Sequence, residues 1–153
     1  MLSVVLAAAL ALPQAGTFVP GQSLGGIRLG TPEAKVRQAW GPHVGVCRGC
    51  PRRTLYFTYG KFEQTGAGVE ARSGRAVALF TLWVPTGWKT NRGVHLGDGP
   101  PSVHGVYGTL PRVECGHYYA LVQRRRNVVS AFYFKGDVLW AFGLMRRSVA
   151  VCR

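Results

Sequence analysis

The chain has 153 residues, a formal net charge of +13 and 47% hydrophobic residues. This apolar content suffices for a packed core, so it excludes a wholly disordered protein. The 21 Gly and 9 Pro residues favour many turns and short strands over long helices. Only six residues are acidic, which leaves few groups for acid–base catalysis, so we expect a protein that is not an enzyme.

The first 17 residues have the pattern of a secretion signal. Residues 2–12 form an uncharged apolar run, and small residues offer cleavage after Ala11 or near Ala15-Gly16. The run lacks a preceding Lys or Arg, and a buried first strand or helix is the alternative reading. It is also shorter than the ~20 apolar residues of a membrane span. We therefore predict a signal peptide at 1–17, a secreted or cell-envelope location, and no membrane span in the mature chain.

Two segments of the chain are similar to each other at an offset of 67 residues. Residues 26–30 read Gly-Ile-Arg-Leu-Gly, and residues 93–97 read Gly-Val-His-Leu-Gly. The register returns later, where the hairpin at 72–80 matches the hairpin at 134–142. Chance could supply one such pentamer, but not the whole order twice, so we predict an internal duplication.

Each copy reads as a short helix followed by strands. Thr31-Pro32-Glu33 predicts a helix start and Gly41 predicts its end, and Asp98 and Gly108 take the same roles in the second copy. Aromatic and β-branched runs then predict strands. The predicted fold is α+β: two tandem repeats of a short helix and an antiparallel meander form one extended antiparallel sheet, with both helices on one face. The expected boundaries are repeat 1 at 24–84, a linker at 85–92 and repeat 2 at 93–153.

Four cysteines are present, at Cys47, Cys50, Cys115 and Cys152. An even count in a small exported domain favours two disulfides. Three pairings are open; we favour Cys47–Cys50 and Cys115–Cys152, because each bridge then stays inside one repeat. The C-x-x-C spacing of Cys47 and Cys50 also fits a thiol–disulfide protein. No second such motif or pair of histidines completes a metal site, so no metal or other cofactor is predicted.

The duplicated order resembles a known superfamily. The order runs from Gly26-Ile27-Arg28-Leu29-Gly30-Thr31 through Val36 and Trp40-Gly41-Pro42 to an aromatic strand at 55–59, and the second copy repeats it from Gly93. This order resembles the SmpA/OmlA-like and β-lactamase-inhibitor-protein-like (BLIP-like) superfamily. The resemblance implies a secreted two-copy inhibitor whose concave sheet clasps an enzyme, or, for single-copy members, a periplasmic lipoprotein that assists outer-membrane protein assembly. The +13 charge and the lack of a lipid-bearing Cys depart from both groups.

Two groups of side chains are candidates for binding. Three consecutive arginines at a predicted hairpin tip can grip carboxylates or phosphates, although a solvated turn is the alternative. Aromatic side chains on an open, concave sheet face can anchor an interface, although alternation does not decide which of them lie in the core instead. The candidate residues are Arg124, Arg125, Arg126, Tyr56, Tyr119, Trp83, Trp140 and Phe142.

These observations predict a secreted, non-catalytic binding module, protein-binding or inhibitor-like, that uses its concave sheet face. One alternative is a basic cell-envelope protein held on anionic surface polymers, since a charge of +13 attracts polyanions. A second alternative is a thiol–disulfide protein at Cys47 and Cys50. The expected partner is another protein or an anionic cell-surface polymer. Nucleic acid is disfavoured, because an exported protein meets it less often.

Overall fold

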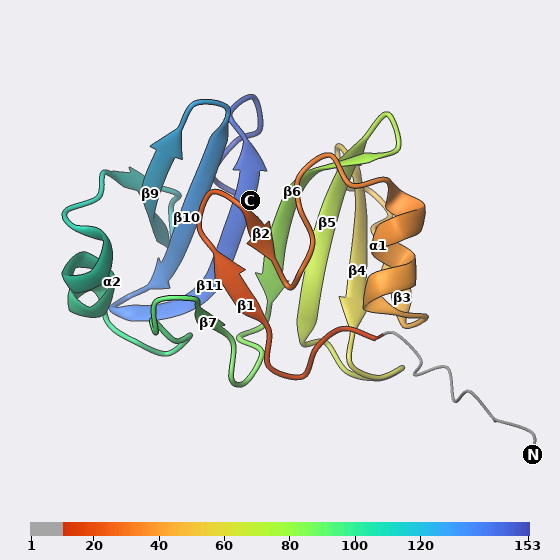
Figure 1. The fold of residues 1–153 in the computed structure, drawn as a ribbon, viewed down its shortest axis with the longest axis horizontal. Coiled ribbons are helices and arrows are strands. Elements are labelled where there is room, and N and C mark those ends of the chain that lie inside the picture. The colour runs from red at the N-terminus through yellow and green to blue at the C-terminus, as the bar shows by residue number, and fades with distance from the viewer. Residues whose placement is uncertain (1–10) are drawn as a thin grey trace, which may run out of the picture.

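The computed structural model describes residues 11–153, in which an eight-stranded antiparallel sheet is the largest element (Figure 1). Its strand order is β3-β4-β5-β6-β11-β10-β9-β8. These strands are β3 (Val44–Val46), β4 (Arg53–Thr58), β5 (Gly66–Arg72), β6 (Arg75–Leu82), β8 (Arg112–Glu114), β9 (Tyr119–Arg125), β10 (Val128–Lys135) and β11 (Val138–Arg146). The remaining elements are a small sheet of β2 (Ser23–Leu24), β1 (Thr17–Val19) and β7 (Lys89–Thr90), and the helices α1 (Glu33–Trp40) and α2 (Pro100–Tyr107).

The large sheet consists of two meanders that meet at their last strands. The hairpin between β5 and β6 turns at Ser73-Gly74, where both residues have positive φ values of 51° and 73°. Such turns match the right-handed twist of the strands. Between the meanders, β6 pairs with β11 in antiparallel register, with Phe80 opposite Gly143 and Ala78 opposite Met145. The sheet is therefore continuous across the middle of the molecule.

Both helices stop at a glycine. Gly41 and Gly108 have φ values of +90° and +79°, a region that favours glycine, and their N–H groups close the last turn. The predicted caps are wrong, because neither helix has a side-chain cap. The carboxylate of Asp98 accepts from the backbone N–H of His95 instead.

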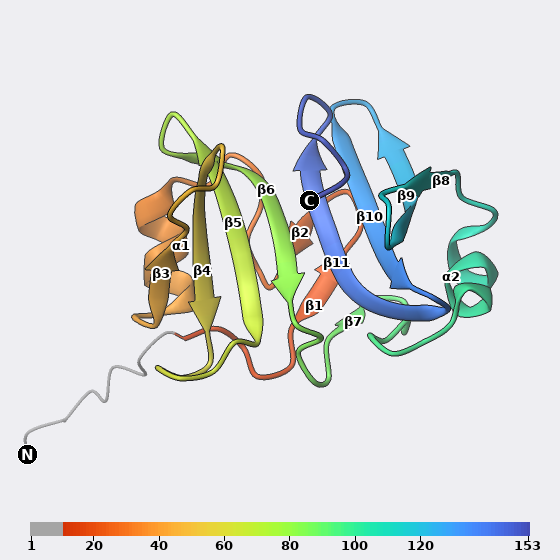
Figure 2. The ribbon, with the colours of Figure 1, turned by 180° about the vertical axis from the view of Figure 1, so that it is seen from behind.

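One face of the large sheet is covered and the other is open. In Figure 1 the helices and the small sheet lie in front of the sheet and at its two ends. The main core fills this layer, and its largest fully buried side chains include Phe18, Trp40, Phe57, Trp88, Phe132, Phe134 and Phe142. Figure 2 shows the opposite face, where the middle strands are open to view and the chain after β11 crosses in front of part of them.

The predicted fold class is wrong. Residues 11–153 are 43% strand and 11% helix, so the fold is mostly β rather than an α+β fold of two helix-plus-meander repeats. Each helix has only eight residues. The small sheet has no place in the predicted scheme either: β1 precedes the first predicted repeat, and β7 lies in the predicted linker and pairs with β1 in parallel. Hydrophobic periodicity missed these strands because they are only two or three residues long.

The predicted signal peptide, residues 1–17, lies only partly within the described structure. Residues 1–10 lie outside the described part of the chain. Residues 11–17 belong to the fold: Leu12 is 4% exposed in the main core, and its N–H donates to the Trp40 carbonyl at 2.9 Å. Cleavage after Ala11 would keep these contacts, whereas cleavage near Ala15-Gly16 would remove them. Within residues 11–153, no helix has the length and apolar character required to cross a membrane.

Candidate functional site

The open face of the large sheet holds a groove of about 530 Å³. Its walls come from both meanders and from the loops that follow β4 and β6. Six aromatic side chains dominate the lining, and few charged groups reach it. The lining aromatics are Tyr56, Phe80, Trp83, Tyr118, Tyr133 and Trp140, and the charged side chains are Glu63, Lys135 and Arg153. A mostly apolar hollow with a few polar groups is the usual form of a ligand site.

Glycines in the sheet let aromatic rings lie on the floor of this groove. A Cβ atom on Gly68 would lie 2.4 Å from the Phe80 ring, and one on Gly143 would lie 2.8 Å from the Tyr133 ring. Both glycines are paired with Phe80 across neighbouring strands. Any larger residue at these two positions would lift the rings off the sheet, so the glycines define the depth of the groove.

The groove mouth contains strained backbone. Trp83 and Val84 follow β6 and have φ values of 58° and 53°. The left-handed region is costly for L-residues and especially for a β-branched one such as Val84. The Trp83 side chain is 62% exposed at this edge of the groove. Strain of this kind concentrates at ligand-binding positions, and here it holds a large apolar ring in solvent.

The indole of Trp140 forms part of the opposite wall. Its edge meets the ring of Tyr118, with centroids 6.1 Å apart, and the Lys135 ammonium lies 5.2 Å from its centroid. The indole N–H is buried and has no hydrogen-bond acceptor among residues 11–153. A donor of this kind can serve a ligand carbonyl.

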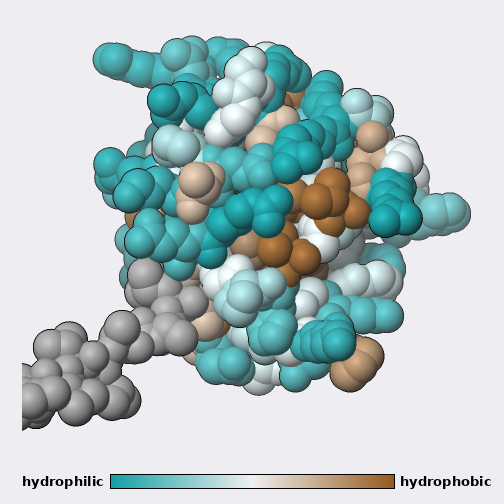
Figure 3. Space-filling model, turned by 90° about the vertical axis from the view of Figure 1, so that its right-hand side faces the viewer, coloured by the Kyte–Doolittle hydropathy of each residue, from teal (hydrophilic) through white to brown (hydrophobic). Residues whose placement is uncertain are grey.

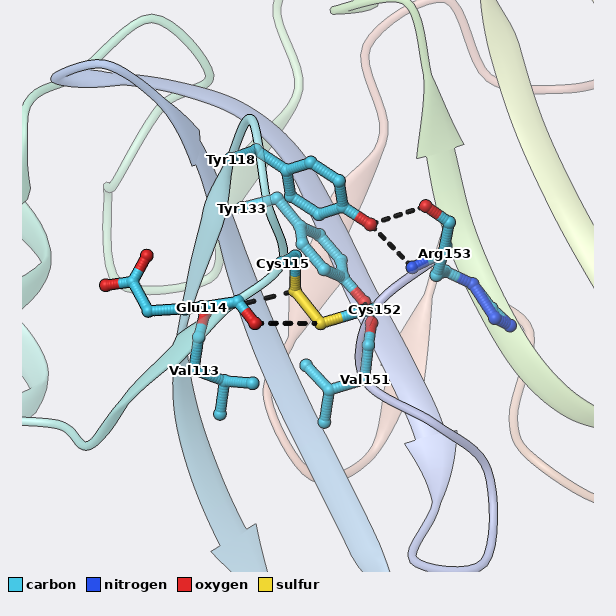
Figure 4. Close-up of a disulfide and its surroundings, with 8 residues drawn as sticks. All are labelled: Val113, Glu114, Cys115, Tyr118, Tyr133, Val151, Cys152 and Arg153. Carbon is cyan, nitrogen blue, oxygen red and sulfur yellow. Dashed lines mark hydrogen bonds between the residues drawn. A yellow bond between two sulfur atoms is a disulfide. The ribbon is translucent and has the colours of Figure 1, made fainter.

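The chain after β11 folds back over part of the open face, and a disulfide fixes it there (Figure 4). The bond between Cys115 and Cys152 joins the loop before β9 to this tail. Beside it, the Tyr133 hydroxyl donates to the Val151 carbonyl at 2.5 Å. The hydroxyl of Tyr118 donates to the Arg153 carbonyl and accepts from the Arg153 N–H at 2.6 Å. Burial raises the pKa of the Tyr133 phenol, so this hydroxyl stays protonated and remains a donor.

An ion-pair cluster connects the tail to the first meander. Glu70 of β5 is 6% exposed and accepts from Arg52 at 3.0 Å and from Arg153 at 2.6 Å. The Arg153 guanidinium also lies over the Phe80 ring, 4.7 Å from its centroid. Arg153 therefore bridges the two halves of the sheet at one end of the groove, and Glu70 compensates its charge.

The structure brings three of the five predicted aromatics to the groove. Tyr56, Trp83 and Trp140 line it. Tyr119 and Phe142 do not, because both lie in the main core on the covered face. Tyr119 stacks on the ring of a β10 residue, and Phe142 is fully buried against Phe18. Their expected placement on the open face is corrected: alternation along β9 turns Tyr119 toward the helices and the small sheet. In β11 the register shift opposite Tyr133 and Phe134 puts Phe142 on this covered face, although Trp140, two residues earlier, lies on the open one.

The other eleven lining residues were not predicted from the sequence, among them Phe80, Tyr118, Tyr133, Lys135 and Arg153. The central strands carry apolar residues on both faces, as in the run of β10 from Val129 to Phe134. Alternation therefore gives no signal for the open face. The β5–β6 hairpin does not reveal Phe80 either, because its regular register would pair Phe80 with Ala67, and a register shift between Glu70 and Ala71 moves Phe80 opposite Gly68.

The three predicted arginines lie at a hairpin tip. β9 ends at Arg125 and β10 begins at Val128, so Arg126 occupies the turn, with φ of 39°. The Arg147 guanidinium, from the end of β11, donates to the Arg126 carbonyl at 3.2 Å. The tip thus gathers basic residues from two separate parts of the sequence. Alternation along β9 points Arg124 toward the open face and Arg125 toward the covered face.

Both favoured disulfides are present, Cys47–Cys50 and Cys115–Cys152. Cys47 and Cys50 lie in the loop between strands β3 and β4. The dipole at a helix N-terminus lowers a thiol pKa in thioredoxin-like centres, and a loop between two strands does not provide it. Within residues 11–153, no three His, Cys, Asp or Glu side chains are grouped so as to hold a metal ion.

Figure 3 looks onto the end of the molecule formed by α1 and β3, where hydrophilic side chains surround a small hydrophobic cluster. An ion-pair cluster near this end joins α1 to β4. Glu33, in the first turn of α1, accepts from Arg53 of β4 at 2.7 and 2.8 Å and from Arg37 at 3.2 Å. The bidentate Arg53 contact is the main cause that lowers the pKa of Glu33 to about 2.

Comparisons with known proteins found likeness only at the level of structure. No protein-family model matches the chain, and no curated protein matches its sequence. An uncharacterized protein, YfeY, from Escherichia coli has a TM-score of 0.57 and 12% identity over 86% of this chain and 100% of its own. An extracellular protein containing an SCP domain from Bacillus anthracis has a TM-score of 0.53 and 9% identity over 78% of this chain and 44% of its own. A cysteine-rich secretory protein from Staphylococcus aureus has a TM-score of 0.48 and 11% identity over 92% of this chain and 50% of its own.

These findings correct the resemblance drawn from the sequence. The similar structures are YfeY and an extracellular protein that contains an SCP domain, rather than SmpA/OmlA-like or BLIP-like proteins. The repeated glycine-bounded pentamers that suggested the resemblance are short, and they mark turns before helices rather than a family signature. The chain spans about half the length of the Bacillus and Staphylococcus proteins that it matches. At such low identity the likeness concerns the fold alone.

Proposed function

We propose that this protein is an exported, non-catalytic module that binds an extended polypeptide segment in the groove on its open sheet face. The observation that carries the proposal is the lining of this groove, about 530 Å³ walled by six aromatic side chains. Rigid aromatics supply large contact areas at low entropic cost and anchor protein interfaces. Export is supported by the two disulfides, which form and persist in oxidising compartments.

The polar groups of the groove suit a polypeptide better than a charged small molecule. The arginine at its end is already paired with Glu70. The Trp140 indole N–H is a donor without a partner among the described residues, and a backbone carbonyl could accept from it. Catalysis is not proposed, because the carboxylates near the groove are Glu63 and the ion-paired Glu70, and neither is matched with a second acid or base.

A displayed-peptide selection tests this function. Peptides selected on the immobilised protein are expected to bind the wild type with saturation and to shift the NMR signals of groove residues. Trp83→Asn removes one anchoring ring at a position whose positive φ asparagine tolerates. We expect this change to weaken peptide binding by about tenfold or more, as for a central aromatic contact.

Phe62 provides the matched control. It lies in the loop after β4, is 92% exposed and does not line the groove. Phe62→Asn removes a similar apolar area and should leave binding unchanged. The proposal is wrong if no peptide is enriched, or if the Trp83 and Phe62 variants lose affinity equally.

A second function, attachment to anionic cell-surface polymers, is favoured by the arginines at the β9–β10 tip. Arg124, Arg126 and Arg147 are exposed and gather at one end of the sheet. We expect the protein to elute from cell walls at moderate salt, since exposed charges are screened within about 10 Å at 0.1 M. Arg124→Gln with Arg126→Gln should lower the required salt concentration more than Arg48→Gln with Arg72→Gln, which removes the same charge elsewhere. If the two double variants lower the required salt concentration equally, the arginines at the tip contribute only general surface charge and form no specific binding site.

A further inference from the structure

A second, smaller hollow lies on the covered face, away from the groove. Its volume is about 210 Å³, and it is walled by four segments: the β1–β2 turn, the residues after β7, the end of α2, and β9. Figure 1 shows the β1–β2 turn in front of the half of the sheet that contains β9 to β11. The lining residues are Val19, Pro20, Gln22, Asn91, Arg92, Val106, Tyr107, Gln123 and Arg125.

Two guanidinium groups border this hollow without a counter-charge. All six acidic residues of the chain lie elsewhere, and none of them lines it. Arg92 and Arg125 form no ion pair within residues 11–153. Arg92 lies over the Tyr107 ring, 5.3 Å from its centroid. The Arg125 stem lies 3.5 Å from the position that a Cβ atom on Gly21 would occupy. Arg92 is thus positioned by its contact with the Tyr107 ring, and Arg125 lies beside the β1–β2 turn at Gly21.

Two polar atoms of the same hollow have no partner. The Tyr107 hydroxyl and the Gln123 side-chain oxygen are buried, and neither has a hydrogen-bond partner in the described part of the chain. An orphaned buried polar group is costly and uncommon in a native protein. A half-turn of the Gln123 amide presents its N–H groups to the hollow, and the Tyr107 hydroxyl can also donate. The hollow can therefore offer donors from four side chains.

The walls are fixed by the backbone. The Gly21 N–H donates to the Ser130 hydroxyl at 2.7 Å, which ties the β1–β2 turn to β10. The Asn91 N–H donates to the Phe18 carbonyl at 3.0 Å, which ties the residues after β7 to β1. These two walls of the hollow are consequently held by hydrogen bonds to neighbouring strands.

From this geometry we infer that the hollow binds a small tetrahedral oxyanion of the phosphate or sulfate class. Water could satisfy the orphaned hydroxyl and amide, but only an anion could also pair with the two exposed guanidinium groups, which form no ion pair among the described residues. An oxyanion supplies the acceptors and the negative charge together, and arginine pairs with phosphate oxygens through parallel N–H bonds. The volume of about 210 Å³ is several times the ~30 Å³ share of one water molecule, so an anion with some of its hydration fits. This site does not depend on the proposed groove function.

Titration of the full chain with sodium phosphate at constant ionic strength tests the inference. Isothermal titration calorimetry should show saturable binding of one phosphate, with glycerol phosphate as a second probe for an esterified phosphate. Arg92→Gln should weaken binding by about tenfold or more, the loss expected for a charge-assisted hydrogen bond. Tyr107→Phe removes only the hydroxyl and should weaken it by a smaller factor.

Arg48 provides the control, because it is exposed, lies in the loop between β3 and β4, and lines neither this hollow nor the groove. Arg48→Gln should leave phosphate binding within about twofold of the wild type, since the charge that it removes is exposed and screened. Circular dichroism melting of each variant separates loss of binding from loss of folding. The inference fails if neither phosphate nor glycerol phosphate binds with saturation. It also fails if the folded Arg92→Gln and Arg48→Gln variants lose affinity equally, because binding would then reflect general surface charge.

Discussion

Removing the two disulfides separately should destabilise the protein by clearly different amounts. In the chain-entropy description, a cross-link stabilises by restricting the unfolded chain, and its effect grows with the length of the closed loop. Cys115 and Cys152 are separated by 37 residues in sequence, and Cys47 and Cys50 by three. Serine replacement of the first pair should therefore cost about 3.8 kcal/mol, and of the second about 1.6 kcal/mol.

The structure gives a further reason to expect the larger effect at Cys115–Cys152. This disulfide holds the tail whose Val149 side chain is 4% exposed among residues of the open face. The hydrogen bond from Tyr133 to Val151 and the Arg153–Glu70 ion pair still attach the tail when the disulfide is absent. We therefore expect a folded variant of lower stability rather than an unfolded one.

Guanidinium chloride unfolding followed by tryptophan fluorescence measures the difference. With a slope of about 4 kcal/mol/M, the midpoint should fall by about 1 M for the Cys115→Ser and Cys152→Ser double variant. It should fall by about 0.4 M for the Cys47→Ser and Cys50→Ser double variant. Equal shifts, or a larger shift for the Cys47–Cys50 pair, would refute the loop-entropy argument and would assign the Cys47–Cys50 bond a greater role in folding.

Three further predictions concern stability. The pKa of Glu33 is lowered to about 2 in the folded state from an ordinary 4.5, so its contribution to folding stability is complete above pH 4.5 and is lost as the pH falls toward 2. The melting temperature of Glu33→Gln should therefore fall less than that of the wild type between pH 5 and pH 2.5. Parallel curves of melting temperature against pH would contradict the Arg53 pairing. Val84→Asn should raise the free energy of unfolding by about 1 kcal/mol by relieving its positive φ, and urea unfolding that shows no gain would remove the case for strain. A chain that begins at Leu12 should be about 2–3 kcal/mol more stable than one that begins at Thr17, because it keeps a buried leucine; equal thermal melting of the two would show that residues 12–16 contribute nothing to the core.

Local features of the fold were predictable because they depend on neighbours in sequence. Gly41 and Gly108 end the helices, as their lack of a Cβ atom allows. The favoured cysteine pairing was also confirmed. The Cys47–Cys50 bond was predictable because the two residues are only three apart in sequence. The fold class was not predictable, because strands as short as β1 and β7 are stabilised by pairing with distant segments rather than by their own composition.

The sequence alone determined the +13 charge, the turn glycines and the arginine run at 124–126, since these are properties of composition and local spacing. Only the tertiary structure decided which aromatic side chains line the groove. Trp140 faces the open side and Phe142 the core, although both are aromatic residues of the same strand. The physical reason is the register shift between Tyr133 and Phe134: it makes Trp140 the extra residue of β11, so that Trp140 and Phe142 lie on opposite faces although a regular strand would put them on the same one. The central strands are otherwise apolar on both faces, so the pattern of hydrophobic residues does not indicate which face is open.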